Sequence, residues 1–207
     1  MEETARIAAA LGVVVGAHPS YEDREGFGRR PLDIPHAEIA ESLRRQIELL
    51  ADACGRAGTA VRYVKLHGAL YNRAATDDEL AAVIAHTVSE LDSSLMILTL
   101  PECAMARRAT AAGLSVAKEG FIDRAYDRTG ALVSRAAAGS LIGDQSSAAT
   151  RAVRMALEGR VETIEGTDIA ADVDSLCVHG DSANAAAIVA AARKSLESSG
   201  ILIRSFA

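Results

Sequence analysis

Three of the five histidines in this 207-residue sequence directly follow short apolar segments of strand length. They are His18 after residues 13–15, His67 after residues 61–64, and His179 after residues 176–178. Imidazole is the natural acid, base or metal ligand near neutral pH, so side chains of this kind at the ends of strands could do proton chemistry. We therefore predict catalytic roles for His18, His67 and His179, while His36 and His86 fall within helical patterns and receive no role.

Two aspartates accompany these histidines. Asp123 follows the apolar segment 114–117 and the loop after it, and Asp181 stands two residues after His179. We predict that Asp123 and Asp181 orient a histidine or a metal ion, although Asp181 can also begin the closing helix as its N-cap. The adjacent pairs Asp23-Arg24 and Asp123-Arg124 are either local ion pairs that shape their loops or a clamp for an anion.

Cationic, amide and aromatic side chains share the same loops. Lys65 emerges from an apolar segment, where an unpaired ammonium is costly, so it needs either an anionic ligand or a structural partner. The predicted substrate-binding residues are Lys65, Arg24, Tyr71, Asn72, Arg124 and Tyr126. We interpret the aromatic members, with Tyr21, Phe27 and Phe121, as a pocket wall; packing at a barrel mouth is the alternative. The glycines at positions 16, 26, 28, 68, 120 and 180 fit tight turns or a close approach of backbone to ligand.

The elements that must position these residues alternate along the chain. Apolar spacing predicts helices over residues 1–11, 36–56, 76–91, 101–113, 146–158 and 181–198, with Thr76 as an N-cap and Pro101 as a first helical residue. Strands are predicted over residues 13–15, 61–64, 95–100, 114–117 and 176–178, with a further terminal strand over 201–203. Repeated strand–helix units predict a parallel sheet, open or closed into a barrel, with ligands at the carboxyl edge of the strands. No linker divides the chain, so residues 1–207 read as a single domain.

Composition excludes several classes of protein. The 22 basic and 28 acidic residues give a net charge of −6, and no basic tract is present, which argues against a nucleic-acid-binding protein. No apolar run is long enough to cross a membrane, and the acidic start Met1-Glu2-Glu3 is unlike a signal peptide. Three scattered cysteines favour free thiols in the cytoplasm, on helices or within a strand, where they give little support to a cysteine nucleophile. The sequence lacks a GxxxxGK[ST] phosphate loop, a GxGxxG fingerprint, a GxSxG elbow and an HExxH pair.

Four long motifs together resemble the LamB/YcsF family. They are Gly-Ala-His-Pro-Ser-Tyr with its continuation over residues 16–29, Lys-Leu-His-Gly-Ala-Leu-Tyr-Asn over 65–72, Asp-Arg-Ala-Tyr over 123–126, and Val-His-Gly-Asp over 178–181. Their order and spacing are similar to those of the family from end to end of the chain. Leu66 and Glu22 stand where the family usually has proline.

The resemblance implies an α/β fold, a (β/α) barrel of the glycoside hydrolase/deacetylase type. It also implies ATP-dependent opening of 5-oxoproline to glutamate, together with 5-oxoprolinase subunits B and C as partners. Because no phosphate loop is present, ATP would be handled by an unconventional site or shared with the partners.

The family's opening motifs, Asp-Leu-Asn-x-Asp-x-Gly-Glu and a strand ending near Cys-Gly-Phe-His-Ala-Gly-Asp, have no counterpart here. Met1 aligns just after them, so we expect the barrel to lack its first one or two strand units. Such a barrel would leave open strand edges, which favour association into a homo-oligomer.

Two other functions remain open from the residues. The first is a metal-dependent deacetylase or amidohydrolase acting on an N-acyl or carbohydrate substrate, because imidazoles with a carboxylate would suit a divalent metal such as zinc. The second is a subunit that binds a small molecule without catalysis.

Overall fold

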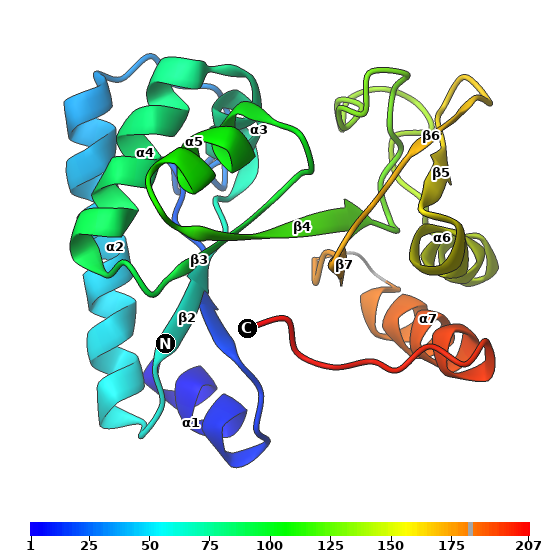
Figure 1. Cartoon of the computed structure of the whole chain (residues 1–207), viewed down its shortest axis with the longest axis horizontal. Coiled ribbons are helices and arrows are strands. Elements are labelled where there is room, and N and C mark those ends of the chain that lie inside the picture. Colours follow the sequence, from blue (N-terminus) through cyan, green and yellow to red (C-terminus); the bar gives the residue numbers. More distant parts are fainter. Residues whose placement is uncertain (182–183) are drawn as a thin grey trace. The chain divides into compact units, whose positions relative to one another are not determined.

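The computed structural model describes residues 1–181 and 184–207. This chain divides into two compact units, residues 1–117 with Ala207, and residues 118–206. Each unit is described by itself below (Figure 1). The single domain expected for residues 1–207 stays a prediction.

The first unit consists of helices and parallel strands in alternation. Its elements are α1 (Glu2–Ala10), β1 (Val15–Ala17), α2 (His36–Arg56), β2 (Val61–Val64), α3 (Gly68–Thr76), α4 (Asp78–Leu91), β3 (Met96–Thr99), α5 (Ala104–Ala111) and the start of β4 (Ser115–Phe121). Strands β1 and β2 pair in parallel, as do β2 and β3. Val64 lies opposite Ala17 on one side and Ile97 on the other, so the carboxyl ends of these three strands lie at one edge of the sheet.

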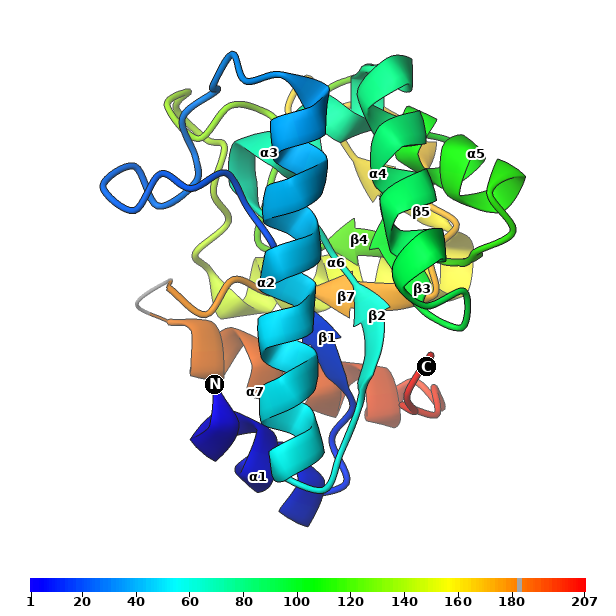
Figure 2. The same ribbon diagram turned by 90° about the vertical axis from the view of Figure 1, so that its left-hand side faces the viewer.

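Helix α2 covers β1 and β2 and also packs against α4 (Figure 2). Its spacing of apolar residues produces a single buried stripe that includes Ile39, Leu43 and Ile47. The bounds of α2 and β2 agree with those predicted from the sequence. This layer of helix over sheet holds the strand ends that carry His18 and His67.

The second unit contains the later part of β4 and the remaining elements. These are α6 (Gln145–Glu158), β5 (Arg160–Glu162), β6 (Asp168–Ala170), β7 (Ser175–Cys177) and α7 (Ala185–Ser198). Strands β4 and β7 pair in parallel, with Phe121 opposite Cys177, whereas β5 and β6 form a short antiparallel pair. Helix α6 packs on α7, and small alanine side chains on their buried faces suit a close approach.

The predicted α/β class with parallel strands is confirmed. In the first unit each parallel strand lies beside the next one in the chain, which is the strand order that a β/α barrel requires. None of the helices in the described residues is long and apolar enough to span a membrane.

Several predicted boundaries in the first unit were wrong. The first strand starts at Val15 because Gly12 is left-handed (φ 66°) and the N–H of Val13 bonds the carbonyl of Ala8, which closes α1. Thr76 ends α3, a helix that the periodicity did not predict, and Asp77 caps α4 by accepting the Leu80 N–H at 3.0 Å.

The strand-to-helix turn at Pro101 also differs from the prediction. Helix α5 begins only at Ala104, because Glu102 adopts a left-handed φ of 53° and the thiol of Cys103 caps the helix by accepting the N–H of Ala106. Pro101 is therefore part of the turn.

Strand β4 extends to Phe121, beyond its predicted end at Ala117, so residues first assigned to a loop belong to the strand. The antiparallel pair β5–β6 was not predicted. No strand forms over residues 201–203. The closing helix begins at Ala185 rather than at Asp181, and part of its predicted first turn, residues 182–183, lies outside the described residues.

Candidate active site

His18 and His67 lie beside each other in the first unit. Their facing nitrogens, His18 Nε2 and His67 Nδ1, are 3.0 Å apart, and their rings meet edge to face with centroids 4.8 Å apart. Each ring also bonds a backbone carbonyl through its other nitrogen. His18 Nδ1 donates to the carbonyl of Lys65 at 2.7 Å, and His67 Nε2 donates to that of Phe27 at 2.8 Å.

Backbone pairing beyond the strands brings these two histidines together. The N–H of Lys65 bonds the carbonyl of Ala17 at 2.9 Å, and the N–H of His67 bonds that of Pro19 at 2.8 Å. The parallel ladder between β1 and β2 therefore continues past the last strand residues. Because successive side chains of paired strands keep their register, the contact between the imidazoles follows from the ladder.

A loop that follows β1 closes over His67. Phe27 adopts a left-handed φ of 55°, which turns its carbonyl toward His67, and its ring lies edge to face on the imidazole at 5.3 Å. The guanidinium of Arg29 lies over the Phe27 ring at 5.2 Å. The sequence indicated this loop only through its glycines, and the contribution of the Phe27 backbone could not be predicted from residue type.

Asp23 closes the same loop. Its carboxylate accepts the N–H of Gly26 at 2.9 Å and the Nε–H of Arg30 at 2.8 Å. The bond with Arg30, followed by that with Gly26, lowers the pKa of Asp23 to about 2. The predicted local pair of Asp23 with Arg24 is therefore replaced by an ion pair with Arg30, and Arg24 is exposed.

The predicted substrate-binding residues of the first unit have different surroundings. Lys65 is half-buried at the end of β2. On α3, Tyr71 is buried whereas Asn72 is exposed. Their roles in binding stay predictions.

A cavity of about 280 Å³ lies between the loop after β1 and helix α2. Among the aromatic residues expected to form a pocket wall, Tyr21 borders this cavity. Its apolar lining includes Ile39, Leu43 and Leu70, and Glu38 and Glu41 contribute acidic groups.

In the second unit, Asp123 and His179 form a dyad. Both carboxylate oxygens of Asp123 lie 3.0 Å from His179 Nδ1, and Oδ2 also accepts the backbone N–H of His179 at 2.8 Å. Asp123 is only 3% exposed. Burial raises the pKa of Asp123, but the bonds from the ring and backbone of His179 outweigh burial, and the net shift is downward. An ionised Asp123 fixes a proton on Nδ1 and leaves Nε2 as the nitrogen that can act as a base.

The pairing of β4 with β7 positions this dyad. The N–H of Ile122 bonds the carbonyl of Cys177 at 3.2 Å, one step beyond the strands, which brings Asp123 beside His179. The ring of Phe121 stacks on the His179 imidazole with a centroid distance of 5.6 Å. Parallel strand ends therefore create a histidine site in this unit as they do in the first.

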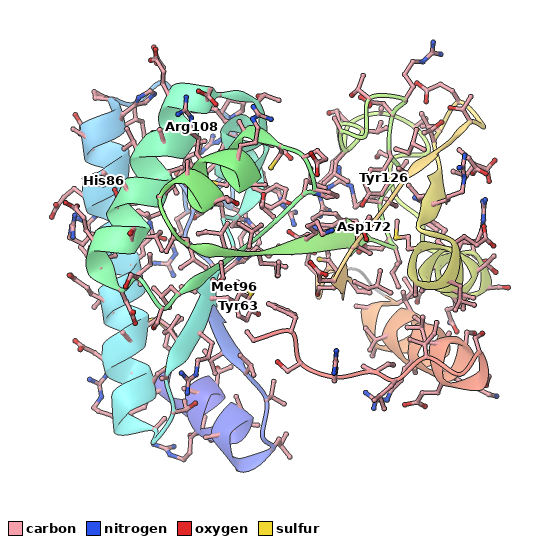
Figure 3. All side chains as sticks on the ribbon, viewed as in Figure 1. Tyr63, His86, Met96, Arg108, Tyr126 and Asp172 are labelled. Carbon is pink, nitrogen blue, oxygen red and sulfur yellow. The ribbon has the colours of Figure 1, made fainter. Side chains whose placement is uncertain are left out.

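Arg124 and Tyr126 stabilise the loop that carries Asp123. The buried Tyr126 hydroxyl (Figure 3) accepts the N–H of Phe121 at 2.7 Å, and burial raises its pKa. Arg124 is also buried and donates to the carbonyl of Val133 at 2.6 Å. These contacts are structural, and contact with substrate stays a prediction for both residues. Asp181 is exposed in the turn after His179, where its predicted role is likewise untested.

Two kinds of ligand were considered at these sites. Among residues 1–181 and 184–207, no group of three or more His, Cys, Asp or Glu side chains could hold a metal ion. The described residues therefore give no support to a protein-bound metal. Lys65 and Arg29, next to the two histidines in the loops of the first unit, have the charge that a phosphate or a carboxylate needs.

Comparison with known proteins gives the class of protein that carries this fold and these sites. The LamB/YcsF family model matches residues 1–207, and the chain belongs to this family. It is 46% identical over 204 residues to the first of the 5-oxoprolinase A subunits of Agrobacterium fabrum, covering 99% of this chain and 80% of that protein.

Two further similarities support the assignment. The 5-oxoprolinase A subunit of Streptomyces coelicolor is 43% identical over 207 residues, which are 100% of this chain and 83% of that protein. The crystal structure of the lactam utilization protein from Thermus thermophilus superposes with a TM-score of 0.92 at 41% identity, over 99% of this chain and 82% of that one.

Proposed function

We propose that this chain is a subunit of a 5-oxoprolinase, which hydrolyses the lactam amide of 5-oxo-L-proline to L-glutamate. The observation that carries the proposal is the Asp123–His179 dyad, a buried carboxylate bonded to an imidazole at a strand end. The names of the relatives supply the substrate: two proteins more than 40% identical to this chain are each named as the A subunit of a 5-oxoprolinase. A lactam is an amide, and its hydrolysis needs a base of this kind.

The reaction determines what the side chains must do. A water oxygen bonds to the lactam carbonyl carbon, the carbon–nitrogen bond breaks, and the released nitrogen gains a proton. His179 Nε2 would take the proton from water, while Asp123 holds Nδ1–H in place and stabilises the imidazolium that forms. The positive charge on His179 is then balanced within the dyad itself.

ATP is the proposed co-substrate, because an amide is resonance-stabilised and phosphorylation of its oxygen would make the carbonyl carbon easier to attack. Lys65 and Arg29 supply the positive charge that a phosphate group or the carboxylate of 5-oxoproline would need in the first unit. The predicted roles of Arg24 and Asn72 in binding belong to the same proposal.

Subunits B and C are the proposed partners, because the relatives are named as the A subunit of an enzyme and such a name implies others. A cytoplasmic location is proposed from the cysteines. Cys54, Cys103 and Cys177 all lie in the described part of the chain, and none forms a disulfide there.

The test is an assay of glutamate formation from 5-oxoproline and ATP with subunits B and C, with and without this chain. We expect turnover only when the chain is present, and a loss of roughly 10²–10⁴-fold in kcat for His179→Gln, the range for removing a general base. The control is His86→Gln, a surface histidine on α4 that is paired only with Glu90 in the contacts seen (Figure 3). Equal turnover by B and C alone would refute the proposal, and binding of 5-oxoproline without turnover would favour a non-catalytic subunit.

A further inference from the structure

The hydrogen bonds of His18 and His67 determine how many protons the two rings carry. A backbone carbonyl oxygen can only accept a hydrogen bond. His18 Nδ1, at 2.7 Å from the carbonyl of Lys65, must therefore carry a hydrogen, and so must His67 Nε2, at 2.8 Å from that of Phe27. These two protons are all that a pair of neutral imidazoles possesses.

The facing nitrogens are then left without a proton in two neutral rings. His18 Nε2 and His67 Nδ1 lie 3.0 Å apart, a distance typical of a hydrogen bond. Two lone pairs at this separation repel each other, whereas one additional proton between them makes a charge-assisted hydrogen bond. We propose that His18 and His67 share one proton between Nε2 and Nδ1 and act as a single cationic unit.

A metal ion is the other occupant that two converging lone pairs could bind. Zinc–nitrogen bonds of about 2.0–2.1 Å at a tetrahedral angle separate two ligand nitrogens by roughly 3.3 Å. The observed 3.0 Å is shorter and fits a proton better. No third ligand joins the two rings in any metal-binding group of the described residues.

The charged groups on the surrounding elements of the first unit also affect this proton. They are Lys65 at the end of β2, Arg29 beside Phe27, and the ion pair of Asp23 with Arg30 that closes the loop. The two cations disfavour a further positive charge, so the proton depends on the imidazole–imidazole bond and the two carbonyl bonds. An anionic substrate placed among these cations would stabilise the protonated pair.

A use for the shared proton rests on the proposed function. When the lactam carbon–nitrogen bond breaks, the nitrogen must gain a proton, and a protonated imidazole pair can donate it. The proton leaves the pair, the nitrogen becomes an amine, and two neutral rings remain. Without the proton, the facing lone pairs repel each other, so the pair would recover it from water.

Nuclear magnetic resonance of the full chain labelled with ¹⁵N-histidine tests the shared proton without any activity measurement. In chelator-treated protein between pH 5 and 9, we expect a coupling through the hydrogen bond between His18 Nε2 and His67 Nδ1. The four ring nitrogens of the pair should carry three protons, and the coupling should disappear with the third proton in one step. Two protons on rings that remain in contact would overturn the proposal, as would independent titration of each histidine. A contact between the rings that forms only after addition of ZnCl₂ at one ion per chain would overturn it in favour of a metal site.

Variants separate the proton from its use. His86→Gln should leave the coupling intact, and His67→Gln should abolish it. In the assembled enzyme, His18→Gln and His67→Gln should each lower kcat at least tenfold while circular dichroism remains unchanged. A shared proton with unchanged kcat would refute the acid role alone. Absence of turnover by the wild-type complex would refute the proposed function and leave the magnetic resonance result standing.

Discussion

Gly68 and Gly28 meet backbone to backbone where the loop after β1 docks on the start of α3. A Cβ atom on Gly68 would lie 2.4 Å from the carbonyl oxygen of Gly28, and the same oxygen accepts the N–H of Ala69 at 2.9 Å. Gly68 also has a left-handed φ of 61°. The contact holds the loop so that the neighbouring carbonyl of Phe27 reaches His67.

Gly68→Ala should displace this loop, because the new methyl group cannot fit against the Gly28 carbonyl. The matched control is Gly58→Ala, which has a similar φ of 74° but no atom within 4 Å of its Cβ position. Both variants should lose about 1–2 kcal/mol for the left-handed conformation. Only Gly68→Ala should lose more in urea unfolding and also weaken the hydrogen bond of His67 to Phe27. Equal destabilisation of both variants would contradict the role of the contact.

Asp123→Asn should lower kcat of the assembled enzyme by roughly 10²–10⁴-fold, the range for a disabled general base. The two oxygens of Asp123 accept one hydrogen bond each from the backbone and the ring of His179, whereas an asparagine can accept at only one oxygen. Its amide N–H₂ would face another donor, and the ring would turn or change tautomer.

Asp172→Asn is the control for this prediction. It alters an exposed aspartate of the same unit (Figure 3), which forms an ion pair with Lys118. It should leave kcat unchanged, because exposed pairs contribute little to stability. If Asp123→Asn were as active as Asp172→Asn, with folding confirmed by circular dichroism, Asp123 would not position the base.

The fold could be predicted largely from periodicity, and the site partly from residue type. Strand-end histidines indicated His18, His67 and His179, because parallel strands place their carboxyl ends at one edge. The partners of these histidines could not be predicted in the same way. The carbonyl of Phe27 belongs to the backbone, which every residue has, and its position depends on a left-handed φ.

Local sequence was also misleading where two signals competed. Asp23 stands next to Arg24, but the loop folds back and places Arg30 on its carboxylate. Similarly, Thr76 and Asp77 are both good N-cap residues, and sequence alone does not decide between them. Only the end of α3 at Thr76 leaves Asp77 with the extended backbone that a cap requires.

Asp77→Ala should therefore lower the free energy of unfolding by about 1 kcal/mol, the usual cost of losing an N-cap. Its carboxylate accepts the N–H of Leu80, which also lowers its pKa, and it receives a hydrogen bond from Arg73. Thr76→Ala is the comparison, because the Thr76 hydroxyl only donates to the carbonyl of Arg73 at 3.3 Å. Urea unfolding at pH 7 measures both variants. A larger loss for Thr76→Ala would restore the boundary predicted from the sequence.

The ion pair of Asp23 with Arg30 predicts how the stability of the first unit depends on pH. The hydrogen bond with Arg30 lowers the pKa of Asp23 from 3.8 to about 2 in the folded protein. A lowered carboxyl pKa stabilises the fold fully above the unfolded value, and this contribution disappears as pH falls through the folded value. Asp23→Asn should thus be less stable than wild type at pH 7, with the difference shrinking between about pH 4 and pH 2.

The matched control for this pH dependence is Glu25→Gln. Glu25 also approaches Arg30, at 3.8 Å, but its side chain is 91% exposed, so water screens the pair. Urea unfolding of wild type and both variants from pH 7 to pH 2 measures the effect. Glu25→Gln should follow the wild-type curve throughout, whereas Asp23→Asn should approach it only in acid. A difference between Asp23→Asn and wild type that stays constant down to pH 2 would mean that the loop is held by contacts other than the charge of Asp23.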